Sequence, residues 1–208
     1  MECVAIIILA AGGSRRFGEP KQLVEWNGEP LLLSVARSAC GANTDRVIVV
    51  LGAQAPACMA VLEKSLNIDV IINDAWDSGI ASSIRVGIES AEKAGAKAIL
   101  LVLADQPYLT TEVINRFLDQ QRSQASVIAA RYEEIVGPPI LFGSEWFTQL
   151  KNLQGDEGAR HLIRDRRDSI KVIDWPEGAI DFDTPEDLKE ENRKTRLNHE
   201  HNVVRTTT

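Results

Sequence analysis

Continuous apolar runs alternate with segments of helical periodicity along most of this chain, and this alternation constrains its fold more than any other feature. Strands buried on both faces are unbroken apolar runs, and the helices between them cover the two faces of a parallel sheet. The pattern predicts an α/β fold: a single domain with a mostly parallel sheet between two helical layers. The expected strands are 4–10, 46–51, 68–72, 97–103 and 126–131, with short later strands near 138–142, 170–174 and 179–181.

Helical patterns separate these strands. From residue 80 onward, Ile80, Ile84, Ile88 and Ala91 recur at spacings of four and three, which forms one apolar helix face. The domain is expected to cover residues 1–195, followed by a polar tail over 196–208 in which the periodicity is lost. The expected helices lie near 30–41, 54–66, 80–94, 110–122, 143–151, 156–166 and 184–194.

Composition narrows the classes of function. The net charge of −7 argues against a nucleic-acid-binding surface. The apolar stretch at the start is too short for a membrane span and has no basic residues before it, so no membrane association is expected. Cys3, Cys40 and Cys58 match neither a disulfide framework nor a zinc pattern, which favours a cytoplasmic location.

A glycine-rich segment with three cations follows the first strand, and it predicts a site for a polyphosphate. It carries Gly12, Gly13, Arg15, Arg16 and Lys21. Glycine allows backbone N–H groups to approach anionic oxygens closely, and arginine and lysine pair with phosphate. The alternative is a tight turn with solvated arginines. The whole segment reads Leu9-Ala10-Ala11-Gly12-Gly13-Ser14-Arg15-Arg16-Phe17-Gly18-Glu19-Pro20-Lys21.

Two common nucleotide motifs do not fit this segment. Gly13 and Gly18 have the separation of a Walker A motif, but Glu19 and Pro20 follow where lysine and a hydroxyl residue are required. A dinucleotide fingerprint needs an acidic residue at the end of the second strand, and that strand ends in Gly52.

The segment resembles the phosphate loop of nucleotidyltransferases with a GT-A-like Rossmann fold, and within them the molybdenum cofactor cytidylyltransferases and their MobA-like relatives. The match spans almost the whole chain, because four further segments agree with the family pattern in order. These are 78–85 (SGIASSIR), 103–107 (LADQP), 155–160 (GDEGAR) and 181–188 (DFDTPEDL).

The resemblance implies Mg²⁺-dependent transfer of CMP from CTP to the molybdopterin form of the molybdenum cofactor, with release of pyrophosphate. The Leu-Ala-Ala-Gly-Gly start is similar to the cytidylyl branch, whereas guanylyl relatives tend to have Leu-Ala-Gly-Gly. GTP or another phosphorylated acceptor remains an alternative within the class, and a molybdoenzyme apoprotein is a further expected partner. Rivals from other classes are a GT-A glycosyltransferase and a cofactor carrier without catalysis.

The carboxylates that follow two strands are the candidate metal ligands. Asp105 ends the apolar run before Gln106, and the resemblance implies that it holds Mg²⁺; a loop-stabilising role is the alternative. Asp181 is the second predicted ligand. Asp183 is the alternative, although it directly precedes the capping residue Thr184.

The remaining candidates divide between the donor and the acceptor. Lys21 is expected at the α-phosphate. Arg15 and Arg16 are the candidates for the β- and γ-phosphates, with Arg15 preferred on the resemblance, and Asp105 completes the expected catalytic set. Ser82 and Ser83 either reach the base or ribose or simply cap the helix, and Asp156 is expected to cap the helix through Ile163. Predicted nucleotide-binding residues are Leu9, Ala10, Ala11, Gly12, Gly13, Ser14, Arg15, Lys21, Gly79, Ser82 and Ser83, and predicted acceptor-binding residues are Gly137, Pro139, Gly158 and Arg160.

Overall fold

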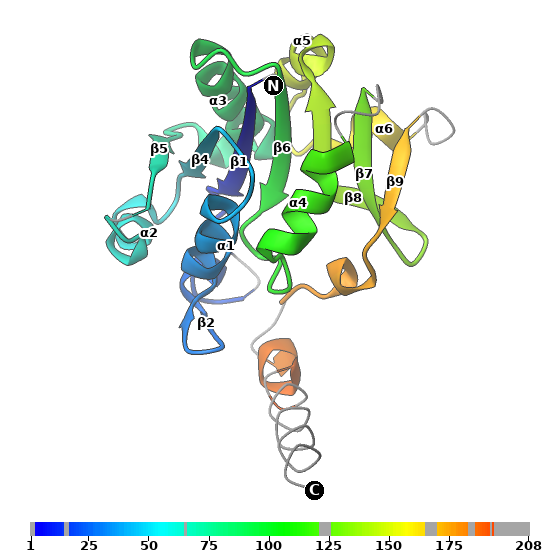
Figure 1. Ribbon diagram of the computed structural model, residues 1–208. Coiled ribbons are helices and arrows are strands. Elements are labelled where there is room, and N and C mark those ends of the chain that lie inside the picture. The colour runs from blue at the N-terminus through cyan, green and yellow to red at the C-terminus, as the bar shows by residue number, and fades with distance from the viewer. Residues whose placement is uncertain are drawn as a thin grey trace, which may run out of the picture.

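A seven-stranded sheet forms the centre of the molecule in the computed structural model (Figure 1), which describes residues 3–14, 17–64, 66–120, 126–164, 170–182, 186–191 and 193. Its strand order is β5-β4-β1-β6-β8-β7-β9, and only β8 runs antiparallel to its neighbours. The strands are β1 (Val4–Ala10), β4 (Arg46–Leu51), β5 (Ile68–Ile72), β6 (Ala98–Leu103), β7 (Val127–Tyr132), β8 (Ile135–Gly143) and β9 (Lys171–Asp174).

Helices cover both faces of the sheet, which confirms the predicted three-layer α/β fold. In Figure 1, α1 and α4 lie in front of the sheet and α3 lies behind it. The α-helices are α1 (Leu31–Cys40), α2 (Ala55–Val61), α3 (Ile80–Lys93), α4 (Thr111–Gln120), α5 (Phe147–Lys151) and α6 (Arg160–Ile163), and residues 186–191 are also helical. Short 3-10 turns are η1 (Lys21–Leu23), η2 (Trp76–Ser78), η4 (Ser144–Trp146) and η6 (Pro176–Ala179).

The side chains of β1 alternate between two apolar cores. Ile6 and Ile8 pack in the core that α1 and α4 cover, while Ala5 and Ile7 pack in the core that α3 covers. All seven residues of β1 are buried. A strand sandwiched in this way needs apolar residues at every position, which explains its unbroken run.

A third apolar cluster lies below the sheet, and the end of the described chain takes part in it. Trp26 packs against Phe182 and Tyr108, with ring centroids 5.2 and 5.5 Å apart. Tyr108 also donates a hydrogen bond to Glu191 in the last helix, at 2.7 Å. Ile180, Phe182, Leu188 and Glu191 therefore pack on the domain, whereas the predicted tail 196–208 lies outside the described residues.

Several predicted elements need correction. The strand expected over 179–181 is absent from the described chain; residues 176–179 form η6 instead, because Pro176 starts a helical turn and cannot donate to a strand. The helix expected over 156–166 begins only at Arg160. A small hairpin of β2 (Glu25–Trp26) and β3 (Glu29–Pro30) was not predicted.

Candidate functional site

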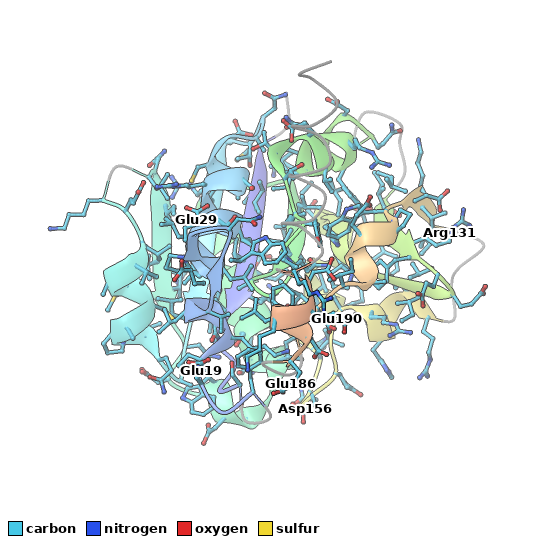
Figure 2. All side chains as sticks on the ribbon, turned by 90° about the horizontal axis from the view of Figure 1, so that it is seen from below. Glu19, Glu29, Arg131, Asp156, Glu186 and Glu190 are labelled. Carbon is cyan, nitrogen blue, oxygen red and sulfur yellow. The ribbon has the colours of Figure 1, made fainter. Side chains whose placement is uncertain are left out.

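The carboxyl ends of the parallel strands meet at the lower edge of the sheet, where a cavity of about 540 Å³ opens. Figure 2 views the molecule from this side and labels Glu19 and Asp156, which come from the two loops after β1 and α5. The cavity is lined by Leu9, Ala11, Gly12, Gly13, Ser14, Lys21, Gln22, Trp76, Asp77, Gly79, Ile80, Ser83, Leu103, Ala104, Asp105 and Asp156.

Most of the predicted nucleotide-binding residues line this cavity. Ala10 and Ser82 do not; both are buried beside it, and Arg15 lies outside the described residues, as does Arg16. The predicted acceptor residues Gly137, Pro139, Gly158 and Arg160 are also not among the lining residues of the described cavity.

The loop after β1 is held from beneath by Gln22, a residue that the sequence analysis missed. The residue is only 6% exposed, and its side-chain amide donates hydrogen bonds to the backbone carbonyls of Ala10 (3.1 Å) and Gly12 (2.8 Å). Ser14 joins the same network: its hydroxyl donates to the side-chain Oε1 atom of Gln22 and accepts from the backbone N–H of Lys21 at 2.9 Å. The loop is thus shaped before any ligand arrives.

Lys21 and Asp105 face each other across the cavity. The ammonium nitrogen of Lys21 lies 3.8 Å from the Oδ2 atom of Asp105, and the two side chains are 14% and 34% exposed. They come together because β1 and β6 are adjacent parallel strands, so the loop after one strand lies beside the residues after the other. The site therefore presents one cation and one carboxylate at a single point.

The start of α3 forms another wall, and its serines are not helix caps. The N-cap position is Gly79, which makes no side-chain capping bond. The buried amide of Asn73 donates to the hydroxyl oxygens of Ser82 (2.8 Å) and Ser83 (3.0 Å), and Ser82 in turn donates to the Gly79 carbonyl. The capping alternative for these serines is thus wrong; Ser83 faces the cavity and Ser82 supports it.

The loop before α6 is packed directly on Gly79. A Cβ on Gly79 would lie 2.2 Å from the backbone carbonyl of Gly155 and 2.8 Å from the nitrogen of Asp156. The N–H of Ala81 donates to the Gly155 carbonyl at 3.1 Å. Asp156 is consequently part of the cavity wall and not the cap of α6, whose N-cap is Ala159.

Tyr132, the last residue of β7, has a phenol whose pKa is shifted upward. Burial raises the pKa of the Tyr132 phenol, the charge of Arg160 lowers it, and the charges of Asp181 and Asp105 raise it. The Tyr132 hydroxyl lies 2.6 Å from the position that a Cβ on Gly137 would take.

The cavity offers one carboxylate of the predicted metal-ligand set, that of Asp105. The described residues contain no group of three or more His, Cys, Asp or Glu side chains placed to hold a metal. Mg²⁺ is usually held by one or two carboxylates together with phosphate oxygens and water. Asp105 lines the cavity, Asp181 is not among its described lining residues, and Asp183 lies outside the described residues.

A family model described as the MobA-like NTP transferase domain matches residues 6–170. The chain belongs to this family. Within the described part of this transferase, no helix combines the length and apolar character that crossing a bilayer requires.

Relatives of this MobA-like NTP transferase have diverse names. It is 31% identical over 192 residues to the purine catabolism protein PucB of Bacillus subtilis (strain 168), covering 87% of this chain and 92% of the relative. It is 28% identical over 202 residues to the nicotine blue oxidoreductase of Paenarthrobacter nicotinovorans, with 90% and 96% covered. The molybdenum cofactor cytidylyltransferase of Escherichia coli (strain K12) is 24% identical over 188 residues, with 90% and 95% covered.

A solved structure has the same fold. It is Rv0371c of Mycobacterium tuberculosis H37Rv in a complex with manganese, 27% identical to this chain with a TM-score of 0.75. The alignment covers 91% of this chain and 97% of Rv0371c.

Proposed function

We propose that this MobA-like transferase moves CMP from CTP to the terminal phosphate of molybdopterin, with Mg²⁺ as its cofactor. The observation that carries the proposal is the Lys21–Asp105 pair, 3.8 Å apart beside the glycine loop. A cation for phosphate and a carboxylate for a metal are the two groups that nucleotidyl transfer requires at one place. Relatives named as molybdenum cofactor transferases, among others, support the choice of acceptor.

In the proposed reaction, a phosphate oxygen of the acceptor forms a bond to the α-phosphorus of CTP. The bond between the α-phosphorus and the bridging oxygen breaks, and pyrophosphate leaves with that electron pair. The protein contributes position and charge and forms no covalent intermediate. Mg²⁺ held by Asp105 and Asp181 would neutralise phosphate charge.

The chain's own residues prepare this geometry. Gln22 and Ser14 hold the loop so that the N–H groups of Gly12 and Gly13 can face phosphate oxygens. Lys21 supplies the positive charge where the α-phosphate gains negative charge, and Arg15 is proposed to bind the β- and γ-phosphates. The acceptor would lie toward Arg160, Gly137, Pro139 and Gly158.

The decisive assay is pyrophosphate release from CTP or GTP with purified molybdopterin and Mg²⁺. We expect release that depends on both CTP and the acceptor and stops when a chelator removes the metal. A preference for GTP would indicate that the protein transfers GMP, which is the guanylyl alternative. No release with any nucleoside triphosphate would refute nucleotidyl transfer to this acceptor.

Lys21→Ala tests the mechanism within that assay. If Lys21 acts mainly in the transition state, kcat should fall about 10²–10³-fold while KM for CTP changes little. Lys64, an exposed cation outside the cavity, offers the matched control Lys64→Ala, which should leave both constants unchanged. A higher KM with unchanged kcat would mean that Lys21 only recruits the nucleotide.

Ala11 is the proposed selector between CTP and GTP. It lines the cavity with 5% exposure, and its methyl group also lies 2.8 Å from the place of a Cβ on Gly52. Ala11→Gly should widen the base site and admit GTP, and a steric filter of this kind gives about 10–200-fold discrimination. Competition of CTP and GTP for limiting acceptor measures the ratio, and an unchanged ratio would exclude Ala11 as the selector.

A further inference from the structure

One of the four tryptophans differs from the others in its surroundings. Trp26, Trp146 and Trp175 are buried, with at most 9% of each exposed. Trp76 is half-buried and lines the cavity between the glycine loop and the start of α3. Leaving part of an indole exposed in an open cavity forgoes some of the free energy that its full burial would contribute, so a ligand-binding role is a natural reason for its position.

The backbone beside Trp76 is shaped to hold the ring in place. Two carbon atoms of the indole six-membered ring, Cζ3 and Cη2, lie 3.1 and 3.4 Å from the position of a Cβ on Gly13. The Cβ of Trp76 itself lies 2.6 Å from the position of a Cβ on Gly52. Glycine at both places gives the indole room, and the ring rests on the loop that is proposed to bind phosphate.

Two carboxylates share this wall of the cavity with Trp76. Asp77 follows it in η2, and Asp156 comes from the loop whose backbone packs on Gly79. Carboxylates accept hydrogen bonds and repel phosphate. Asp77 and Asp156 therefore suit a ligand group that donates hydrogen bonds. The phosphates belong beside Lys21, on the wall that the segments following β1 and β6 form.

We propose that Trp76 is the stacking surface for a planar heterocycle with an exocyclic amine, and that Asp77 and Asp156 accept hydrogen bonds from that amine. This inference rests on the proposed function and names the part of the substrate that this wall recognises. Cytosine and a pterin ring both have the required chemistry, as a flat ring with an amino group. The position of Trp76 on Gly13 favours the nucleobase.

The size of the expected effect follows from the loss of stacking. Replacing an aromatic residue that stacks on a base weakens binding by about 5- to 150-fold. Trp76→Leu keeps an apolar side chain but removes the flat ring, so Kd for CTP should rise by that factor. Trp76→Phe retains a smaller ring and should recover part of the affinity. Tripolyphosphate has no ring, and its Kd should be the same in all three proteins.

Binding is best measured by titration calorimetry and by tryptophan fluorescence. CTP should quench emission of the wild-type protein, and Trp76→Phe should abolish this change. Trp146→Phe is the matched control, because Trp146 packs against Phe142 and is not among the residues that line the cavity. CTP should still quench the fluorescence of the Trp146→Phe variant. Free pterin, titrated in parallel, tells whether the ring belongs to the nucleotide or to the acceptor.

The amine contact has its own test in UTP, which carries a carbonyl where CTP has an amine. The wild-type protein should bind CTP more tightly than UTP, and the double variant Asp77→Asn/Asp156→Asn should reduce this preference. These substitutions keep the side-chain size and remove both charges.

Selective loss of CTP or of pterin binding in Trp76→Leu supports the proposal and identifies the source of the ring. Unchanged Kd for both ligands, or an equal loss for CTP and tripolyphosphate, would overturn it, since the second result indicates a merely structural role. A protein that binds CTP through Trp76 but releases no pyrophosphate would refute the proposed function and leave this inference intact.

Discussion

Replacing Gly79 with alanine should destabilise the protein and deform the cavity at the same time. Gly79 has φ 106° and ψ 169°, a region that is essentially limited to glycine and costs other residues about 1–3 kcal/mol. The new methyl group would also lie 2.2 Å from the Gly155 backbone, so the loop would have to move. Such overpacking costs about 1–3 kcal/mol more.

Two further glycines separate these contributions. Gly95 has φ 81° and nothing within 4 Å of a Cβ, so Gly95→Ala should carry the strain without the collision. Gly158 needs no positive φ, and its Cβ would lie 4.0 Å from Ile80, an ordinary contact; Gly158→Ala should therefore carry neither cost. The entropy that alanine removes from the unfolded chain is common to all three variants and cancels in the comparison.

Urea denaturation should rank the free energies of unfolding as Gly158→Ala highest, then Gly95→Ala, then Gly79→Ala. The step attributable to the collision corresponds to about 2–12 °C in Tm for a chain of this size, if it costs about 1–3 kcal/mol. The affinity for CTP, measured by calorimetry, should fall in Gly79→Ala because Gly79 and Asp156 line the cavity. It should be unchanged in Gly95→Ala. Equal stability of the Gly79 and Gly95 variants would refute the close approach of the two loops.

Three other perturbations test the site. Gln22→Leu removes the donor to the Ala10 and Gly12 carbonyls, so urea denaturation should show a loss of about 1–3 kcal/mol, and unchanged stability would contradict the network. The pKa of the Tyr132 phenol should lie above its ordinary value, and the phenolate absorbance that reports it should be missing in Tyr132→Phe. Because the folded state favours the neutral phenol, this contribution to the free energy of unfolding is complete below about pH 10 and is lost as pH rises through the higher folded pKa. Asp181→Asn should lower kcat and should also lower the pKa of Tyr132. An unchanged pKa of Tyr132 in this variant would mean that Asp181 does not lie near the phenol.

Local sequence signals were sufficient for most of the fold. Unbroken apolar runs located β1, β4 and β6, because burial on both faces leaves no position for a polar residue. The unpredicted hairpin also had a local signal. Asn27 and Gly28 both have positive φ, as a two-residue hairpin turn of type I′ requires, and Asn-Gly is its strongest sequence mark.

Errors arose where short segments have weak local preferences. Ala179, Ile180 and Asp181 have the composition of a short strand, but the pairing of β7 with β9 ends at Arg131 and Asp174, and the chain then turns at Pro176. Asp156 has the side chain of a helix cap, yet the packing of its loop on Gly79 places it on the cavity wall three residues before the true N-cap.

The sequence by itself determined the α/β class and put the glycine loop and Asp105 after strands, since the carboxyl ends of parallel strands lie at one edge of the sheet. The tertiary structure decided that β1 and β6 are neighbours, so that Lys21 meets Asp105. The tertiary structure alone decided that Gln22 supports the loop, that Trp76 forms a wall and that Gly79 receives Gly155. These contacts join residues whose side chains are compatible with many environments. Their partners are set by how helices and loops dock on the sheet, and no local periodicity encodes that docking.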